Sequence, residues 1–254
     1  MLSQWVQSLQ QAVRDRKARS PLTTEVPTLT IEQAYEIQSA GMEIALGAKD
    51  SLCGYKMGLT SRAKQRDVNV YEPIRGYLLS SMEIQKGDAV VRDRWIHPRV
   101  EPELAVVLKS PLGEGATLRD VIRSLEFAGP ALEILDSRYE NFSFSLPDVI
   151  ADNTSAAGFI VGRTNWIDRL NEIGRFGVSI RKNGAVERTG APAAVLGDPL
   201  LSVVGLARAL GREGKRIEAG MVVLTGGITA SIAFEKGDLI ESLWPGEDLS
   251  FRVV

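Results

Sequence analysis

Two apolar, strand-like stretches of this chain carry glutamates in their interior. Glu101 and Glu103 come directly before the apolar run 104–108, and Glu133 lies between a leucine and an isoleucine. Because side chains alternate along a strand, Glu101 and Glu103 are expected on one face. A lone buried carboxylate is costly, and three gathered together would repel one another strongly. A hard divalent cation such as Mg²⁺ or Mn²⁺, which prefers oxygen ligands, would relieve this repulsion.

The spacing of the first two glutamates also has a plainer interpretation. A Glu-x-Glu pair on a strand most often marks the solvated face of a half-exposed sheet, since alternation is the ordinary pattern of such a strand. The apolar residues beside Glu103 and Glu133 weaken this interpretation without reversing it. From the residues alone, a metal site and a solvated face both remain open.

The composition excludes several classes of protein. A formal net charge of -2 implies no general attraction to nucleic acid or acidic membranes, and no apolar run approaches the roughly 18 to 20 residues that span a bilayer. Cys53 is the only cysteine, which excludes an internal disulfide. His97 is the only histidine, which excludes a multi-histidine zinc site within one chain. Residues 1–17 lack the apolar core of a signal peptide, so a cytoplasmic location is expected.

Hydrophobic periodicity predicts helices first. Apolar residues at helical spacing indicate an amphipathic helix over about 2–13. Thr30 with Gln33 resembles a capping box that opens a second helix through about residue 48. Further helices are expected from Thr117 to about residue 127, and from the Asp-Pro pair at 198 to about residue 211.

Most of the remaining chain is predicted to form strands. They are expected at 52–60, 90–91, 100–108, 130–136, 159–161, 177–182, 221–225, 230–234 and 249–254, with a loop at 67–76. This order predicts an α+β fold with N-terminal helices and a mixed β-sheet system curled into a roll or barrel. An N-terminal helical region with the first active-site strand and loop, 1–75, and a mixed-sheet catalytic core, 76–254, are expected to form one functional unit.

Five motifs occur along the chain in a specific order. They are KMGLTS at 56–61, HPRVEPELAVVL at 97–108, PALEILDSRYENF at 130–142, IADN at 150–153 and TGGITA at 225–230. Together they resemble the hydratase/decarboxylase family of the fumarylacetoacetate hydrolase superfamily, over nearly the whole chain from about residue 30 onward. The resemblance implies the mixed-sheet roll of that superfamily's C-terminal domain.

The resemblance also implies an activity, with the decarboxylase branch matching better than the hydratase branch. The expected reaction is the metal-dependent decarboxylation of 2-oxohex-3-enedioate (4-oxalocrotonate) to 2-hydroxypenta-2,4-dienoate and CO2 in aromatic meta-cleavage catabolism. The resemblance implies Mg²⁺ or Mn²⁺ held by Glu101, Glu103 and Glu133, acting as a Lewis acid on the keto oxygen of the substrate. It further implies a homo-oligomer and a complex with the hydratase of the same pathway.

Four further residues are assigned to the substrate site by this resemblance. Lys56 is expected to be catalytic and to bind the oxo-acid end of the substrate, although a lysine there could also extend to solvent. Gly226 and Gly227 would bring backbone N–H groups close to a substrate carboxylate, or else form a bulge or tight turn. Ile74 follows the loop proline, where related hydratases carry an aspartate; it would keep water from the departing carboxylate, or simply pack in the loop.

Other assignments remain open at this stage. Arg138, Asp152 and Asn153 either support the site or cap loops, and His97 is expected to be structural. The same metal site would also serve a 2-oxopent-4-enoate (2-hydroxypentadienoate) hydratase, which is a hydro-lyase, or a C–C hydrolase of acylpyruvates. The sequence offers no obvious Glu/His pair to activate water for a hydrolase. A non-catalytic partner of the hydratase is a further class.

Overall fold

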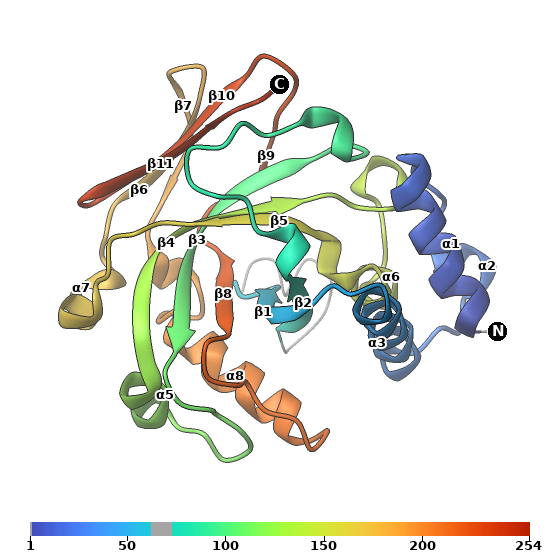
Figure 1. The fold of residues 1–254 in the computed structure, drawn as a ribbon, viewed down its shortest axis with the longest axis horizontal. Coiled ribbons are helices and arrows are strands. Elements are labelled where there is room, and N and C mark those ends of the chain that lie inside the picture. The colour runs from blue at the N-terminus through green and yellow to red at the C-terminus, as the bar shows by residue number, and fades with distance from the viewer. Residues whose placement is uncertain (1, 62–72) are drawn as a thin grey trace.

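The computed structural model describes residues 2–61 and 73–254 as two β-sheets flanked by helices (Figure 1). Its helices are α1 (Leu2–Asp15), α2 (Leu22–Glu25), α3 (Ile31–Gly47), α5 (Leu118–Ser124), α6 (Leu146–Ala151), α7 (Leu170–Ile173) and α8 (Leu200–Gly211). Its strands are β1 (Leu52–Gly58), β2 (Ile74–Leu79), β3 (Arg99–Leu108), β4 (Leu125–Leu135), β5 (Ala156–Val161), β6 (Val178–Lys182), β7 (Ala185–Gly190), β8 (Val222–Gly227), β9 (Ile232–Ala233), β10 (Leu239–Trp244) and β11 (Glu247–Arg252).

The larger sheet has seven strands among the described residues and curls on itself. Its order is β2-β1-β8-β3-β4-β5, with β9 paired to β3. The pair β1 and β8 is parallel, and the other pairs are antiparallel. Beyond β2, the N–H of Ile84 donates to the carbonyl of Phe159 on β5 at 2.9 Å, so the two outer strands approach each other. This curl confirms the predicted α+β fold with a mixed-sheet roll.

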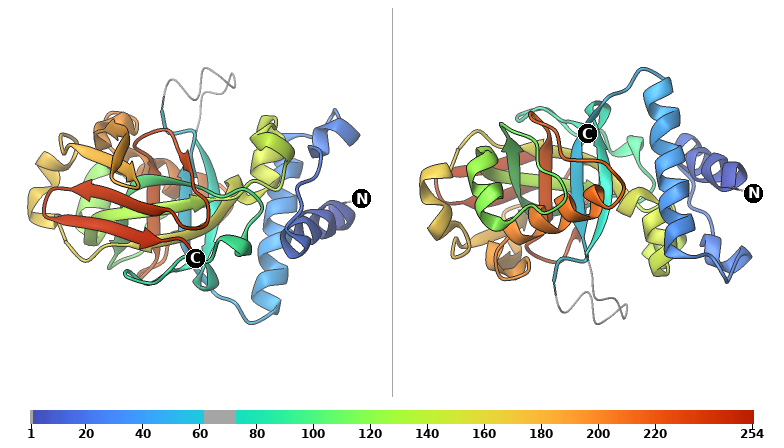
Figure 2. Two further views of the ribbon diagram at one scale, coloured as in Figure 1. Left: turned by 90° about the horizontal axis from the view of Figure 1, so that it is seen from above. Right: turned by 90° about the horizontal axis from the view of Figure 1, so that it is seen from below.

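The smaller sheet covers one face of β3 and β4, so the side chains on their other face point into the curl of the larger sheet. Its order is β11-β10-β6-β7, and it packs over β3 and β4 (Figure 2). Val100, Leu132 and Ile134 belong to the apolar layer between the two sheets. Because neighbouring side chains on a strand point to opposite faces, Glu101 and Glu133 point into the curl.

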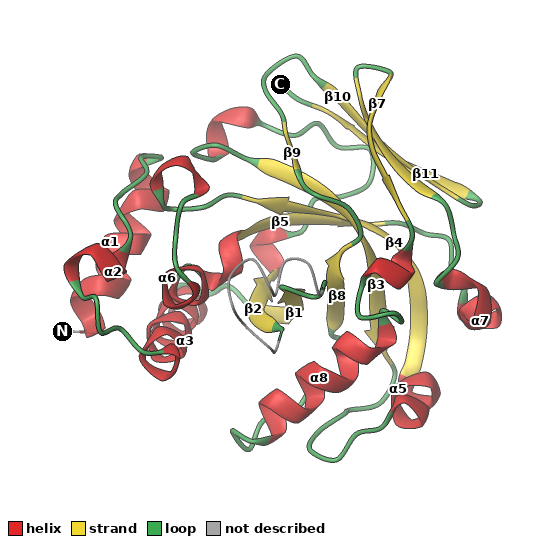
Figure 3. Ribbon diagram, turned by 180° about the vertical axis from the view of Figure 1, so that it is seen from behind, coloured by secondary structure: helices red, strands yellow, loops and turns green. Residues whose placement is uncertain are grey.

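Helices cover the remaining faces of the larger sheet. In Figure 3, α5 and α8 lie below the larger sheet, and their apolar residues share one core with it. The helices α1, α3 and α6 pack on one another at the other end of the molecule, around a separate apolar cluster. Inside the curl lies a small cluster of buried apolar residues: Leu78, Ala105, Ala131, Phe159 and Leu224.

The local signals were confirmed in part. The capping boxes at Thr30 and Thr117 are both present, each with the side-chain oxygen accepting from the backbone N–H three residues on. The helix after Thr117 ends at Ser124 rather than near residue 127, because β4 begins at the next residue. The strand predicted at 90–91 is wrong, since Val90 forms only an isolated bridge.

The predicted loop at 67–76 also needs correction. Because β2 begins at Ile74, residues 74–76 of the predicted loop are strand. Residues 67–72 lie outside the described residues. The division of the chain at residue 75 stays a prediction. Within 2–61 and 73–254, none of the helices combines the length and the apolar character needed to cross a bilayer.

Candidate active site

Glu101, Glu103 and Glu133 come together inside the curl of the larger sheet. The register of β3 and β4 places Glu101 opposite Glu133, and Glu103 opposite Ala131. One carboxylate oxygen from each glutamate lies within 4.8 Å of the others. The three residues are 5%, 0% and 0% exposed, so the solvated-face interpretation is wrong. Their role as metal ligands stays a prediction.

This cluster is electrostatically unfavourable by itself. Burial raises the pKa of Glu103 well above its usual range, and Glu133 and Glu101 raise it further. Burial also raises the pKa of Glu133; Lys56 opposes this rise, and Glu101 adds to it. Among the described residues, Oε1 of Glu103 and Oε1 of Glu133 have no hydrogen-bond donor. Three gathered, buried carboxylates, two of which have such oxygens, are a donor set that fits a hard divalent cation.

Lys56 lies beside the cluster on β1. Its Nζ is 3.1 Å from Oε2 of Glu133, an ion pair without hydrogen-bond geometry, and donates to the carbonyl of Thr154 at 3.2 Å. The residue is 3% exposed, so the alternative in which its ammonium extends to solvent is wrong. The structure therefore places one positive charge against the buried carboxylates, where it lowers their repulsion.

Gly226 and Gly227 allow β8 to run close to the glutamates. Gly226 has φ +116°, and a Cβ there would collide with the side chain of Thr60. Its N–H donates to Oε2 of Glu103 at 2.7 Å. A Cβ on Gly227 would collide with the carboxylate of Glu101. The register between β3 and β8 shifts at this point, as in a β-bulge. The two interpretations given for these glycines, a bulge and a close approach of the backbone, therefore both apply. Contact of either glycine with substrate stays a prediction.

A cavity of about 210 Å³ opens beside Lys56 and Glu101. Ile74 lies in its wall, where the sequence predicted it, and is buried. Besides Lys56 and Glu101, the polar residues of the wall are Ser145, Thr154, Ser155 and Ser231. The remaining apolar lining is mostly aromatic or branched: Leu59, Leu135, Phe142, Phe144, Leu146 and Val149.

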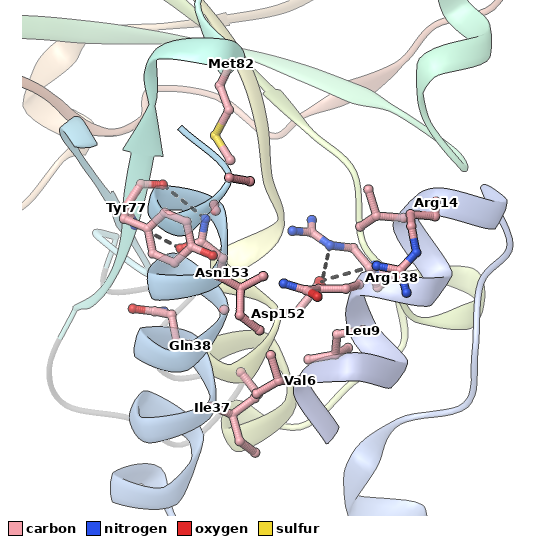
Figure 4. A pocket seen from close by; sticks show the side chains of 17 residues that line it. Val6, Leu9, Arg14, Ile37, Gln38, Tyr77, Met82, Arg138, Asp152 and Asn153 are labelled. Carbon is pink, nitrogen blue, oxygen red and sulfur yellow. Dashed lines mark hydrogen bonds and ion pairs between the residues drawn. The ribbon is translucent and has the colours of Figure 1, made fainter. Parts of the chain in front are cut away.

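Arg138 and Asp152 do not line this cavity. Arg138 Nε lies 2.9 Å from Oδ1 of the buried Asp152, and both residues border a separate cavity of about 360 Å³ next to α1 and α3 (Figure 4). Burial raises the pKa of Asp152 to about 6, against the opposing charge of Arg138. Nε2 of His97 lies 2.8 Å from the carbonyl of Ser137, which agrees with a structural role.

Sequence reasoning missed the contribution of the segment after IADN. Thr154 and Ser155 both line the smaller cavity, and Thr154 supplies the carbonyl that holds Lys56. The available signal was the asparagine at 153, a residue type that tolerates the left-handed backbone conformation found here.

No protein-family model matches the chain. Several curated proteins are similar to it, among them a decarboxylase and a hydratase. The 4-oxalocrotonate decarboxylase of Pseudomonas putida is 41% identical over 226 residues, which are 89% of this chain and 86% of that protein. The 2-hydroxyhexa-2,4-dienoate hydratase of Comamonas testosteroni is 33% identical over 243 residues, covering 94% and 92%.

Solved structures agree with these relatives. The 4-oxalocrotonate decarboxylase from Pseudomonas putida G7, complexed with magnesium and adipate, matches with a TM-score of 0.96 and 37% identity over 100% of this chain and 97% of that chain. The fumarylpyruvate hydrolase from Pseudomonas aeruginosa, with a TM-score of 0.61 and 15% identity over 79% of this chain and 88% of that chain, shares the fold alone. The chain therefore belongs to the family of 4-oxalocrotonate decarboxylases and related 2-oxo acid hydratases.

Proposed function

We propose that this chain is a divalent-metal-dependent carbon–carbon lyase that converts 2-oxohex-3-enedioate to 2-hydroxypenta-2,4-dienoate and CO2. The observation that carries the proposal is the buried three-glutamate cluster with Lys56 at its edge, open to a largely apolar cavity. Three relatives named 4-oxalocrotonate decarboxylase are 37 to 41% identical to this chain, and five related hydratases are 33 to 36% identical.

The proposed cofactor is Mg²⁺ or Mn²⁺. Glu101, Glu103 and Glu133 would hold it, because their carboxylate oxygens are gathered and buried, and Oε1 of Glu103 and Oε1 of Glu133 have no hydrogen-bond donor among the described residues. When bound, the cation supplies Lewis-acid polarisation of the oxo-acid group of the substrate. The magnesium in the Pseudomonas putida G7 enzyme and the manganese in the fumarylpyruvate hydrolase support this choice of ion.

Lys56 would act on the oxo-acid end of the substrate. As the bond between C5 and the departing carboxylate breaks, its electron pair moves through the C3=C4 system and negative charge develops on the C2 oxygen. A buried ammonium next to that oxygen stabilises the developing charge more than it stabilises the neutral ketone. The same group can donate a hydrogen bond to this oxygen and assist its protonation.

The apolar wall of the cavity would favour loss of CO2 over addition of water. Ile74, Phe142 and Phe144 contribute to it. A carboxylate that leaves as neutral CO2 gains from such surroundings, because they destabilise its charge. Hydration instead needs a group that positions or deprotonates water. Within the described part of the chain, Lys56 and Glu101 are the only ionisable side chains in the wall.

The test is product analysis with purified protein. Incubation with 2-oxohex-3-enedioate and Mg²⁺ should release one CO2 for each 2-hydroxypenta-2,4-dienoate formed, and a chelator should stop the reaction. Formation of 4-hydroxy-2-oxopentanoate from 2-hydroxypenta-2,4-dienoate would assign the hydratase activity instead. C–C cleavage of an acylpyruvate would assign a hydrolase. An inactive protein that still binds metal and the hydratase would favour the non-catalytic partner.

We further propose a cytoplasmic location, a homo-oligomer, and association with the hydratase that consumes the product. The product is an unstable dienol, so direct transfer to a neighbouring enzyme would limit its loss. Light scattering of the purified chain, alone and mixed with such a hydratase, tests both forms of assembly.

A further inference from the structure

Three consecutive residues in the left-handed region form a buried turn between α6 and β5. The φ angles of Asn153, Thr154 and Ser155 are 51°, 50° and 58°, and each residue is 3% exposed. This region is unfavourable for residues other than glycine, and especially for a β-branched residue such as Thr154. A run of three persists only where its surroundings over-determine it.

The central residue of this turn contacts the active-site lysine. Thr154 presents its carbonyl to Nζ of Lys56, which lies between that carbonyl, at 3.2 Å, and Oε2 of Glu133, at 3.1 Å. The direction of a carbonyl follows from the backbone dihedrals of its residue. A return of the turn to right-handed geometry would therefore remove the carbonyl that accepts from the ammonium and leave the ion pair with Glu133.

Asn153 ties the turn to β2. The N–H of Tyr77 donates to Oδ1 of Asn153 at 2.8 Å, and Nδ2 of Asn153 donates to the carbonyl of Tyr77 at 3.0 Å (Figure 4). The side-chain amide thus pairs with the strand as a neighbouring strand would. Gly76, the ladder partner of Lys56, permits this approach, since a Cβ there would collide with Thr154 Oγ1.

We propose that Asn153 is a positioning residue for Lys56: its amide fixes the left-handed turn against β2, and the turn fixes the ammonium. The proposal rests on the function proposed above for Lys56. Asn153 lines the 360 Å³ cavity beside α1 and α3, not the 210 Å³ cavity, so it acts through the turn and not on the substrate. Asparagine suits the position because it tolerates positive φ and offers both a donor and an acceptor.

The principal test is Asn153→Gly, which tolerates positive φ and removes only the amide. We expect kcat for decarboxylation to fall by about tenfold to a hundredfold, as for a misplaced catalytic group. The Mn²⁺ dissociation constant, measured by titration calorimetry, and KM should change by less than about twofold. An unchanged kcat overturns the proposal.

The matched control is Asn165→Gly. Asn165 also ties a strand through both amide atoms, accepting from the N–H of Ala128 at 3.1 Å and donating to the carbonyl of Glu126 at 3.0 Å, at the far end of β4. This substitution should lower thermal stability and leave kcat unchanged. An equal loss of kcat in both variants would assign Asn153 a purely structural role and overturn the proposal.

A double-mutant cycle with Lys56→Ala separates this inference from the proposed function. If Asn153 acts only through Lys56, adding Asn153→Gly to Lys56→Ala causes no further loss of kcat. A further loss of about the same factor overturns the inference. Full activity of Lys56→Ala alone would instead overturn the proposed role of the lysine. Should Asn153→Gly not fold by circular dichroism, Asn153→Asp, which keeps the acceptor for Tyr77, replaces it in the same cycle.

Discussion

Glu101 and Glu133 are directly opposite partners on the antiparallel strands β3 and β4, and both are buried. Like charges in opposite positions destabilise a sheet, and burial removes the water that would screen them. Glu103 adds a third carboxylate within 4.8 Å. The centre of this sheet therefore opposes folding unless the charges are neutralised, and that cost explains both the proposed cation and the position of Lys56.

Replacement of Glu103 should separate stability from metal binding. Glu103→Gln removes one buried charge and keeps an oxygen that can accept from Gly226. We expect the metal-free variant to be more stable than the wild type by about 1 kcal/mol or more, because a carboxylate buried beside two others is costly. The stabilisation by saturating Mg²⁺, about 3 kcal/mol at a hundredfold excess over Kd, should vanish together with activity.

Thermal unfolding with and without Mg²⁺ measures both effects. The matched control is Glu126→Gln, which changes an exposed glutamate on the neighbouring strand β4 and should retain activity and the shift in Tm caused by Mg²⁺. A Glu103→Gln variant that keeps the shift would remove this residue from the ligand set. Full activity of chelator-treated wild type would contradict the whole metal assignment.

Loss of the active-site lysine should reduce turnover and spare the metal. Lys56→Ala removes the only basic side chain found in the described wall of the 210 Å³ cavity. We expect kcat to fall by about a hundredfold or more, because the developing charge loses its partner. Mn²⁺ binding should persist, with tighter binding reflecting the loss of a competing positive charge. The control is Lys86→Met, which replaces a half-buried surface lysine. Steady-state kinetics compares kcat of the two variants.

Most elements of the fold, and the shared face of Glu101 and Glu103, were accessible from the sequence because each depends on a local pattern, whereas the choice of a metal site over a solvated face came from the family resemblance. Alternation along 99–108 determines that Glu101 and Glu103 share a face, and the TGGITA motif marks the strand that runs beside them. The capping residues Thr30 and Thr117 identify two helix starts from four residues each.

The missing parts depend on contacts between distant segments. The turn at Thr154 is held by β2, which lies about 77 residues earlier in the chain, so no local pattern predicts its left-handed geometry. Ile74 was expected in a loop for the same reason. The local sequence Pro-Ile-Arg-Gly does not predict its pairing with Gly58 on β1.

Introduction of a carboxylate at Ile74 should change the products. Ile74→Asp places a water-binding group in the otherwise apolar wall beside Lys56. We expect decarboxylation to slow by about tenfold or more, and some product to appear as the water adduct, because an aspartate can orient or deprotonate water. The measurement is product analysis by NMR in labelled water. Ile74→Val, which keeps the wall apolar, should give CO2 and dienoate only; water adduct from both variants, or from neither, would show that residue 74 does not control water.

Stability should also depend on pH through Asp152. Its pKa is raised from 3.8 to about 6 by burial, against the opposing charge of Arg138. A carboxyl with a raised folded-state pKa contributes stability that is complete below the unfolded pKa of about 4 and is lost as pH rises through about 6. The expected loss across this window is about 3 kcal/mol.

Urea unfolding of wild type and Asp152→Asn at pH 4 to 7 measures this loss, because the variant cannot ionise. The stability difference between the two proteins should therefore shift against the wild type as pH rises. A constant difference would mean that the Arg138 guanidinium fully compensates burial, and that Asp152 is ionised throughout the range.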